Sequence, residues 1–131
     1  MTVFVCVDDN FGLTFNNRRQ SRDSAVIEKI KEFVGENTLY IRPFSAKMLK
    51  ESVVISENML DECSHGDYCF AEDVDLAEYA DKISTLVLFK WNRDYPSDMK
   101  LTMDFDGWQM EEAFDFVGTS HEKITCEVWK K

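Results

Sequence analysis

The sequence predicts a single α+β domain (α/β-like), in which a mixed or mostly antiparallel sheet carries two to four packed helices. The chain has 131 residues, which is the size of one domain. It is 44% hydrophobic and 31% charged, as globular proteins ordinarily are. Strand-like segments outnumber helix-like ones, and the helices concentrate in the first two thirds. No repeat, low-complexity tract or linker interrupts the chain, so we expect one compact domain over residues 1–131.

The first third of the chain predicts a strand, a loop and a helix. Residues 2–7 are rich in Val and Phe, as a buried strand would be. The polar segment 8–23 contains a single glycine and predicts a long loop. A helix over about 24–34 is indicated because its apolar residues recur on one face. Asp23 or Ser24 is placed to cap that helix.

The middle of the chain alternates short strands with short helices. Apolar runs are brief here, and Pro, Gly and polar residues separate them. In chain order we expect a strand over 38–42, a short helix over 45–51, a strand over 53–56, a helix over 57–64, a strand over 68–71 and a helical turn over 76–82.

The last third is dominated by strands. The long apolar run 85–91, free of Gly and Pro, gives the strongest strand prediction. A turn follows at 92–98. Residues 100–106 alternate apolar with polar side chains, which predicts a half-buried antiparallel strand. Residues 108–117 fit either a strand or a helix, and 124–129 should form the last strand.

The negative charge lies in one part of the chain. The net charge is −10, from 25 acidic and 15 basic residues. Residues 1–60 carry 8 of each, so residues 61–131 hold the whole excess. An acidic pole repels nucleic-acid phosphates and attracts basic surfaces. We therefore expect a basic protein partner and no direct binding of nucleic acid, although the acids could also serve only as a solubilising surface.

Membrane and export features are not expected. No apolar run reaches 18 residues, so no membrane span is predicted. The first residues have no basic segment or cleavage site, and they indicate a strand rather than a signal peptide. The four cysteines should then be reduced thiols in a cytoplasmic protein. They are Cys6, Cys63, Cys69 and Cys126. The Cys-x-His-x₃-Cys spacing around His65 lacks a second pair, so we expect no metal and no cofactor.

The segment 8–23 is the best candidate for a binding site. Acids follow the first strand, where ligands of α/β sheets tend to lie. Arginines precede a helix start, whose free N–H groups favour anions. They could bind a phosphorylated ligand together with Mg²⁺, or pair internally with the acids. The candidate residues are Asp8, Asp9, Asn10, Arg18, Arg19, Arg22 and Asp23.

Two further places offer candidate residues. His121 could act as a general acid or base if the fold brings it to the segment 8–23, and otherwise it belongs to a surface turn. Trp91, Arg93 and Tyr95 lie at and after the end of the run 85–91. Aromatic and Arg side chains anchor protein interfaces, so these three could hold a partner, or they could simply pack a hairpin.

Four segments resemble a family of small bacterial proteins without an established function. They are 8–23, 66–70, 89–96 and 120–124. Some members carry the label ribonuclease Z. That enzyme class resembles metallo-β-lactamases and needs a His-x-His-x-Asp-His motif with further histidines. This chain has two histidines in total, His65 and His121, which excludes such a two-metal phosphodiesterase.

The sequence thus leaves two functional hypotheses. We favour a non-catalytic acidic domain that binds a basic partner, as an immunity or inhibitor protein would. The one-sided charge supports it, and no nucleophile–base pair is recognisable in the sequence. The alternative is a small enzyme or ligand-binding domain for a phosphorylated metabolite or nucleotide. In that case the segment 8–23 would hold the ligand, and His121 would move a proton.

Overall fold

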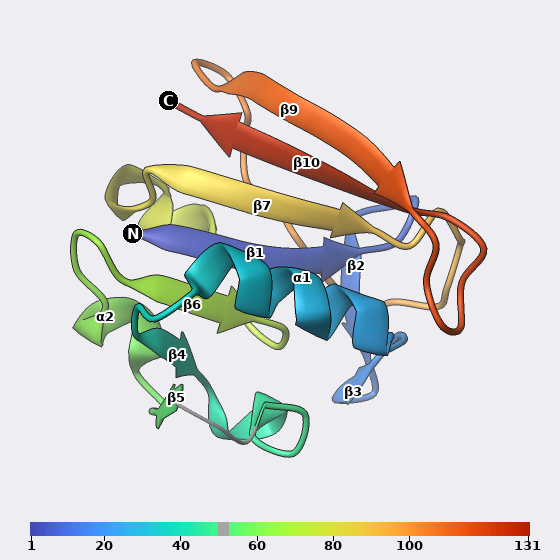
Figure 1. The fold of residues 1–131 in the computed structure, drawn as a ribbon, viewed down its shortest axis with the longest axis horizontal. Helices are drawn as coiled ribbons and strands as arrows, with labels where there is room; N and C mark the ends of the chain where they lie inside the picture. Colours follow the sequence, from blue (N-terminus) through green and yellow to red (C-terminus); the bar gives the residue numbers. More distant parts are fainter. Residues whose placement is uncertain (50–52) are drawn as a thin grey trace.

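The fold is built on a seven-stranded mixed sheet with helices on it (Figure 1). The computed structural model describes residues 1–49 and 53–131. The strands are β1 (Thr2–Val7), β2 (Gly12–Phe15), β3 (Arg18–Arg19), β4 (Leu39–Ile41), β5 (Val53–Ile55), β6 (Tyr68–Ala71), β7 (Thr85–Lys90), β8 (Met99–Lys100), β9 (Gln109–Phe116) and β10 (Ile124–Lys130). The helices are α1 (Ser24–Val34) and the single turn α2 (Met59–Glu62), with 3-10 turns at Pro43–Ser45 and Ala77–Lys82.

The strand order in the large sheet is β5-β4-β6-β1-β7-β10-β9. The first five strands of this order, from β5 to β7, run parallel to one another, and β10 is antiparallel to both β7 and β9. Strands β2, β3 and β8 form a small antiparallel sheet of their own. The predicted single α+β domain with a mixed sheet is therefore confirmed, and the mixed form of the sheet is the one adopted.

The large sheet separates two hydrophobic clusters, because successive side chains of a strand point to opposite faces. On one face Phe4 packs with Val26, Ile30 and Val34 of α1. The other face buries Val3, Val5 and Val7 of β1 under α2, the turn at 77–82 and the small sheet. Each face therefore has its own cover, and β1 lies between the two as the centre of the fold.

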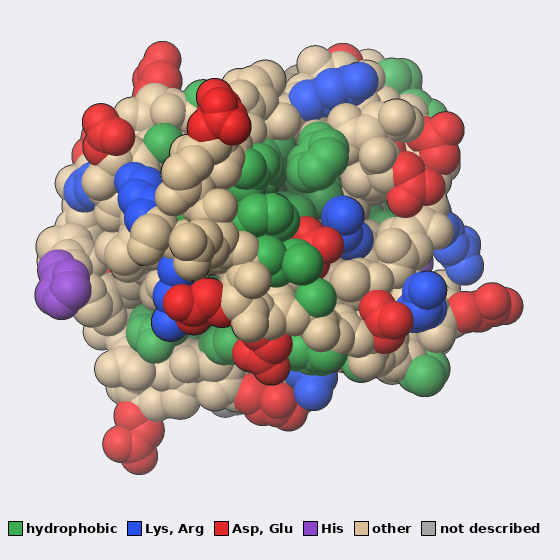
Figure 2. Space-filling view, turned by 90° about the horizontal axis from the view of Figure 1, so that it is seen from above, with side chains coloured by type: hydrophobic (Ala, Val, Ile, Leu, Met, Phe, Trp, Pro, Cys, Tyr) green, Lys and Arg blue, Asp and Glu red, His purple; other side chains and the backbone are tan. Residues whose placement is uncertain are grey.

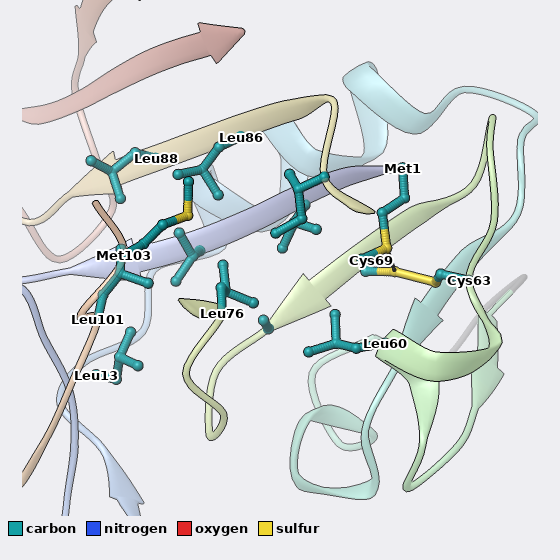
Figure 3. Packing of buried hydrophobic residues seen from close by; sticks show 14 of the residues in the cluster. Met1, Leu13, Leu60, Cys63, Cys69, Leu76, Leu86, Leu88, Leu101 and Met103 are labelled. Carbon is teal, nitrogen blue, oxygen red and sulfur yellow. Dashed lines mark hydrogen bonds between the residues drawn. A yellow bond between two sulfur atoms is a disulfide. The ribbon is translucent and has the colours of Figure 1, made fainter. Parts of the chain in front are cut away.

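Figure 3 shows the second cluster, in which Leu86 and Leu88 lie toward Leu101 and Met103, and Met1 lies at the other side beside Cys69. The alternation over 100–106 comes from this packing. The predicted strand there is wrong beyond the short β8, because the segment crosses the sheet face and pairs with β2 only at its start. Burial alternates on such a segment just as it does on a paired strand.

The same cluster contains a disulfide between Cys63 and Cys69, both buried (Figure 3). The expectation of four reduced thiols is therefore wrong for this pair. The end of α2 and the strand β6 direct their sulfur atoms into one apolar cluster, although six positions separate the cysteines in the sequence. Cys6 and Cys126 are free.

Helix α1 matches the predicted helix from its first residue to its last. Asp23 is its N-cap and accepts a hydrogen bond from the Ala25 N–H at 2.9 Å. Gly35 ends the helix with a φ of 57°, a left-handed conformation that glycine adopts without strain. The apolar face of the helix lies on the sheet, as its sequence period requires.

Several other predictions need correction in detail. The segment 8–23 is not a plain loop, because β2 and β3 form a small hairpin within it through Asn16 and Asn17, both at positive φ. The helix expected over 57–64 shortens to α2, and the one over 45–51 is replaced by the 3-10 turn ahead of it. Residues 50 and 51 of that prediction lie outside the described residues. The ambiguous segment 108–117 is a strand, β9.

The helices and the surface bear on the predicted absence of a membrane span and on the predicted acidic pole. In the described residues, no helix has the length and apolarity needed to cross a membrane. Figure 2 shows one face of the molecule, on which acidic side chains spread around the outline with basic ones among them. That face is not an acidic pole. Hydrophobic side chains gather in its hollowed middle.

Candidate functional site

The candidate site lies where four parallel strands end. Strands β1, β4, β6 and β7 run in one direction, so their carboxyl ends share one edge of the sheet. Asp8 follows β1, Glu72 follows β6 and Trp91 follows β7. The β2–β3 hairpin and the start of α1 lie at the same edge (Figure 1). Ligands of open α/β sheets characteristically bind beyond this edge.

Asp8 organises the segment that follows β1. It is 1% exposed, and its carboxylate accepts hydrogen bonds from the N–H groups of Asn10, Gly12 and Tyr95 and from the Gln20 amide. Burial raises the pKa of Asp8, but these four donors outweigh it, so the pKa is lowered. The carboxylate is fully occupied in holding the loop, and the site offers it no role as a Mg²⁺ ligand.

Arg19 is fixed by a partner from the neighbouring strand end. Its guanidinium binds the Glu72 carboxylate through Nε at 2.9 Å and Nη2 at 3.1 Å, and Nη2 also donates to the Phe44 carbonyl. The Ser45 hydroxyl donates to the same carboxylate at 2.7 Å. The hydrogen bond to Glu72 raises the pKa of Arg19. The internal pairing expected for the loop therefore joins Arg19 to Glu72, not to Asp8 or Asp9.

Two adjoining hollows open beside this arginine. One has a volume of about 580 Å³ and lies over Phe15, Arg18, Gln20 and Tyr95. The other, of about 530 Å³, contains Ser21 and more cations. Both include Arg18 and Arg19. The basic groove, as we call the two hollows together, is lined by the cations Arg18, Arg19, Arg22 and Lys47 and by no acidic residue among those described.

Asp23 is the most heavily hydrogen-bonded side chain of the site. Besides capping α1, it accepts from the N–H groups of Thr119 and Ser120, from the Thr119 hydroxyl and from the imidazole of His121. Burial raises the pKa of Asp23, but these donors outweigh it and hold the pKa well below its ordinary value of 3.8. Asp23 is therefore a buried carboxylate, and it ties the turn before β10 to the start of α1.

His121 lies inside this network, 4% exposed. Its Nδ1 is 2.9 Å from Oδ2 of Asp23. Since an ionised carboxylate only accepts, Nδ1 carries a proton, and in the neutral form of an imidazole with that tautomer Nε2 is an acceptor. The Ser21 hydroxyl at 3.0 Å and the Tyr95 hydroxyl at 3.2 Å both reach that nitrogen. The fold thus brings His121 to the segment 8–23, across 98 positions from Asp23.

Trp91 holds the imidazole from one face. Its ring stacks on His121 with a centroid distance of 4.6 Å and an interplanar angle of 22°. The indole is 4% exposed. Trp91 therefore packs within the site and presents no anchor to a partner. Tyr95 is half-buried, with its hydroxyl on His121, and Arg93 is exposed on the turn.

The remaining candidates lie at the outer rim. Asp9 and Asn10 are exposed, and the Asn10 amide donates to the Asp94 carboxylate at 2.7 Å. The described residues include no carboxylate paired with Arg18 or Arg22. In the same part of the chain no three His, Cys, Asp or Glu side chains converge as a metal site requires.

Sequence reasoning missed Ser21 and Glu72. Ser21 was one polar residue among many in the segment 8–23, and only the approach of His121 distinguishes it. Glu72 follows the short strand β6 directly, just as Asp8 follows β1. That shared position was the signal that could have found Glu72.

The arrangement combines two chemical capacities. The basic groove can hold an anionic group on guanidinium and ammonium donors. Beside it stands an imidazole whose Nδ1 donates to Asp23 and whose Nε2 faces two hydroxyls. Such an imidazole can take a proton from a hydroxyl.

Comparisons with known proteins identify a similar fold but no family. No family model matches the chain, and no curated protein matches its sequence. The fold matches a solved structure of dihydrofolate reductase from Enterococcus faecalis complexed with NADP(H) and RAB-propyl. The TM-score is 0.75 at 12% identity, and the match covers 98% of this chain and 94% of that chain. At this identity the likeness shows the fold alone.

This match overturns the functional hypothesis that the sequence favoured. A non-catalytic, immunity- or inhibitor-like acidic domain was expected, but nearly the whole chain takes the fold of a reductase solved with bound small molecules. Net charge carried that hypothesis, and charge says nothing of fold. The basic partner stays a prediction that neither the fold nor the comparisons identify. The chain shares the fold of dihydrofolate reductase, and its site lies at the carboxyl edge of the parallel strands.

Proposed function

We propose that the chain is a small enzyme or ligand-binding domain that takes a phosphorylated metabolite or nucleotide into the basic groove. The observation that carries the proposal is the groove itself. In a chain of net charge −10, four cations line two adjoining hollows whose described linings include no acid. Glu72, outside the linings, offsets the charge of Arg19, and no described carboxylate pairs with Arg18, Arg22 or Lys47. These three like charges gather at a cost in mutual repulsion, which a bound anion relieves.

The geometry of the groove suits phosphate groups. Guanidinium groups bind phosphate oxygens in pairs, and among the described residues no carboxylate pairs with Arg18 or Arg22, so both can do so. Arg19 donates to Glu72 and Phe44 through Nε and Nη2, lies 4.9 Å from the ring centroid of Phe44, and keeps Nη1 for a ligand. Arg18 is exposed and belongs to both hollows, so it can follow a ligand that spans them. The rings of Phe15, Phe44 and Tyr95 offer flat surfaces to an aromatic base.

The size of the groove favours a small molecule over a polymer. Hollows of about 580 and 530 Å³ are in the usual range for small-molecule sites. A nucleic-acid strand would need basic surface beyond the groove, and the rest of the chain is acidic. The reductase of the same fold was solved with NADP(H), a phosphorylated dinucleotide, which supports the same ligand class here.

The test is direct binding of NADP⁺, ATP and inorganic pyrophosphate, measured by isothermal titration calorimetry at low and high salt. We expect at least one of the three to bind, more weakly at high salt because ions screen the cations. Arg18→Ala combined with Arg22→Ala should weaken that binding about tenfold or more, which equals about 1.4 kcal/mol. No change in affinity in this double variant would refute the groove as the site.

The matched control is Lys31→Ala combined with Lys123→Ala. This double variant removes two exposed positive charges that line neither hollow. It should bind like the wild-type chain, which separates contact with the ligand from a general change of net charge. A wild-type chain that binds none of the three probes at millimolar concentration would contradict the proposed ligand class.

A further inference from the structure

Three side chains of the site form a continuous chain of hydrogen bonds. Oδ2 of Asp23 is 2.9 Å from Nδ1 of His121, and Nε2 of the same ring is 3.0 Å from the Ser21 hydroxyl. Carboxylate, imidazole and hydroxyl are thus joined through the two opposite nitrogens of one ring. This is the order of groups by which an imidazole activates a serine.

The imidazole has one tautomer and little freedom to turn. Four donors other than His121 point at Asp23 and favour its ionised carboxylate, so Nδ1 of His121 must donate to it. The side chains of His121 and Asp23 are 2% and 0% exposed, and Trp91 stacks on the ring. Nε2 therefore presents a lone pair toward Ser21, and the ionised Asp23 stabilises the positive charge that the ring acquires on taking a proton.

Tyr95 is the second hydroxyl at Nε2. The neutral ring has one lone pair there, so it accepts from one of the two hydroxyls at a time. The hydroxyls face different parts of the groove, because Tyr95 lines one hollow and Ser21 the other. When the tyrosine hydroxyl turns away, Nε2 is free for Ser21.

Ser21 faces the more cationic of the two hollows. It is half-buried, and it lines the same hollow as Arg18, Arg22 and Lys47. A substrate with an anionic group would be held there beside the hydroxyl. The same cations would stabilise negative charge that develops on an oxygen during attack. The hydroxyl and the source of positive charge thus share one open hollow, and the buried base contacts the hydroxyl.

We propose that Ser21 is the nucleophile of an esterase site, and that its substrate is a carboxylic ester bearing an anionic group. His121 is the general base and Asp23 is the positioning residue that orients it. The proposal rests on the proposed function for the anionic group, which the basic groove would hold. The nucleophile and its base rest on the geometry of Ser21, His121 and Asp23 alone.

The reaction balances with water as the only other reactant. Oγ of Ser21 bonds to the ester carbonyl carbon while its proton passes to Nε2 of His121. The bond from that carbon to the alcohol oxygen then breaks, and Nε2 returns the proton to the departing alcohol. Water next attacks the carbonyl carbon of the acyl-serine and gives one proton to Nε2. The bond from that carbon to Oγ of Ser21 then breaks, Nε2 returns the proton to Oγ, and the acid is released with the serine and the base restored.

The experiment is labelling of the purified chain with a fluorophosphonate probe, followed by intact-mass and peptide mass spectrometry. This probe reacts with activated serines and needs no knowledge of the substrate. We expect one adduct, on Ser21, and none in Ser21→Ala, which removes only one half-buried hydroxyl. His121→Gln should slow labelling about 100-fold or more. Ser24→Ala is the matched control, because Ser24 lies at the start of α1 and bonds Thr119 instead of His121.

Asp23 needs a readout that a merely structural role would not move. The labelling rate of the wild-type chain should fall at acid pH, because a protonated Nε2 cannot accept the serine proton. In Asp23→Asn the ring loses the negative charge that stabilises its protonated form, so this fall should move to lower pH. An unchanged pH profile in Asp23→Asn would contradict the positioning role of Asp23. Tyr95→Phe should still be labelled, because the Tyr95 hydroxyl only competes with Ser21 for Nε2.

Two results would overturn the proposal. One is the absence of any adduct on the folded wild-type chain, and the other is equal labelling of Ser21→Ala. The phosphate-binding proposal fails on different evidence, since it is measured with NADP⁺, ATP and pyrophosphate on arginine variants. A chain that binds the anion and is not labelled keeps the groove and loses the nucleophile. A chain that is labelled on Ser21 but binds none of the three probes keeps the nucleophile and loses the groove as a phosphate site.

Discussion

Glu72 illustrates how one buried acid can position a cation for a ligand. Its side chain is 8% exposed, and its carboxylate oxygens are shared between Arg19 and the Ser45 hydroxyl. A buried carboxylate is stable only with such partners, because it has left water. In return, Glu72 holds the guanidinium at the wall of the groove, at one defined place.

Replacing Glu72 by Gln should cost stability through this network. Gln keeps the shape but lacks the charge, and its amide nitrogen cannot accept from Arg19 or Ser45. We expect the free energy of unfolding, measured with urea, to fall by about 1–3 kcal/mol. Glu111→Gln is the control: Glu111 pairs with Lys130 at 3.2 Å with both side chains about half exposed, and its loss should cost under about 0.5 kcal/mol. Equal losses in the two variants would show that the buried network contributes nothing beyond a surface pair.

At the scale of elements, α1 shares its N-cap with another part of the chain, which stabilises the start of the helix. Its N-cap Asp23 is also the acceptor for the turn at 118–121, so the helix start and the turn before β10 share one carboxylate. A typical N-cap satisfies one or two donors of its own helix. This one joins two elements, and the lowered pKa of Asp23 measures how strongly its charged form is preferred in the folded chain.

This preference makes stability depend on pH in a defined direction. Because the pKa of Asp23 is lower in the folded chain, its contribution is fully present above the unfolded value of about 3.8 and is lost as pH falls toward the folded value. Asp23→Asn should be about 2 kcal/mol less stable at neutral pH. The difference from wild type should shrink in strongly acidic solution. Denaturation curves over a pH series measure it, and Asp9→Asn, at an exposed position, should show no such trend.

The elements that the sequence predicted well are those whose pattern is local. The apolar runs at 2–7, 85–91 and 124–129 became the three adjacent strands β1, β7 and β10. The period of α1 and its cap residue likewise lie within a few positions. The segment 100–106 misled because an alternating pattern records burial, and burial arises equally on a segment that crosses a sheet face.

The site was beyond local pattern. The arginines and His121 could be named as candidates from residue type, but the hydrogen bond between Ser21 and His121 joins positions 100 apart. Adjacent residues gave no hint of it, because only the order of strands in the sheet brings the two segments together. Trp91 was recognised as aromatic, and its stacking on the imidazole depends on the same tertiary placement.

At the scale of the whole molecule, the low accessibility of the cysteines shows that both faces of the sheet are covered. Cys126 is buried, and its burial raises the pKa of its thiol to about 12. Burial also raises the pKa of Cys6. Cys63 and Cys69 are joined to each other under the opposite face. Since the thiolate is the reactive form, none of the four should react readily in the folded chain.

Titration with a thiol reagent at mildly alkaline pH should show this. We expect little reaction in the folded chain, two thiols after unfolding without a reductant, and all four after unfolding and reduction. Four thiols without a reductant would contradict the disulfide. Rapid reaction in the folded chain would show that β1 or β10 is accessible to solvent, against their burial in the sheet.

The separation of 98 positions between Asp23 and His121 has a consequence for biosynthesis. A ribosome delivers the hydroxyl and the helix start early, and it delivers the imidazole only after most of the sheet has been made. Until then Ser21 is an ordinary alcohol in an incomplete polypeptide. Reactivity can therefore arise only with the completed sheet, so that unfinished or truncated chains in the cell carry no activated serine.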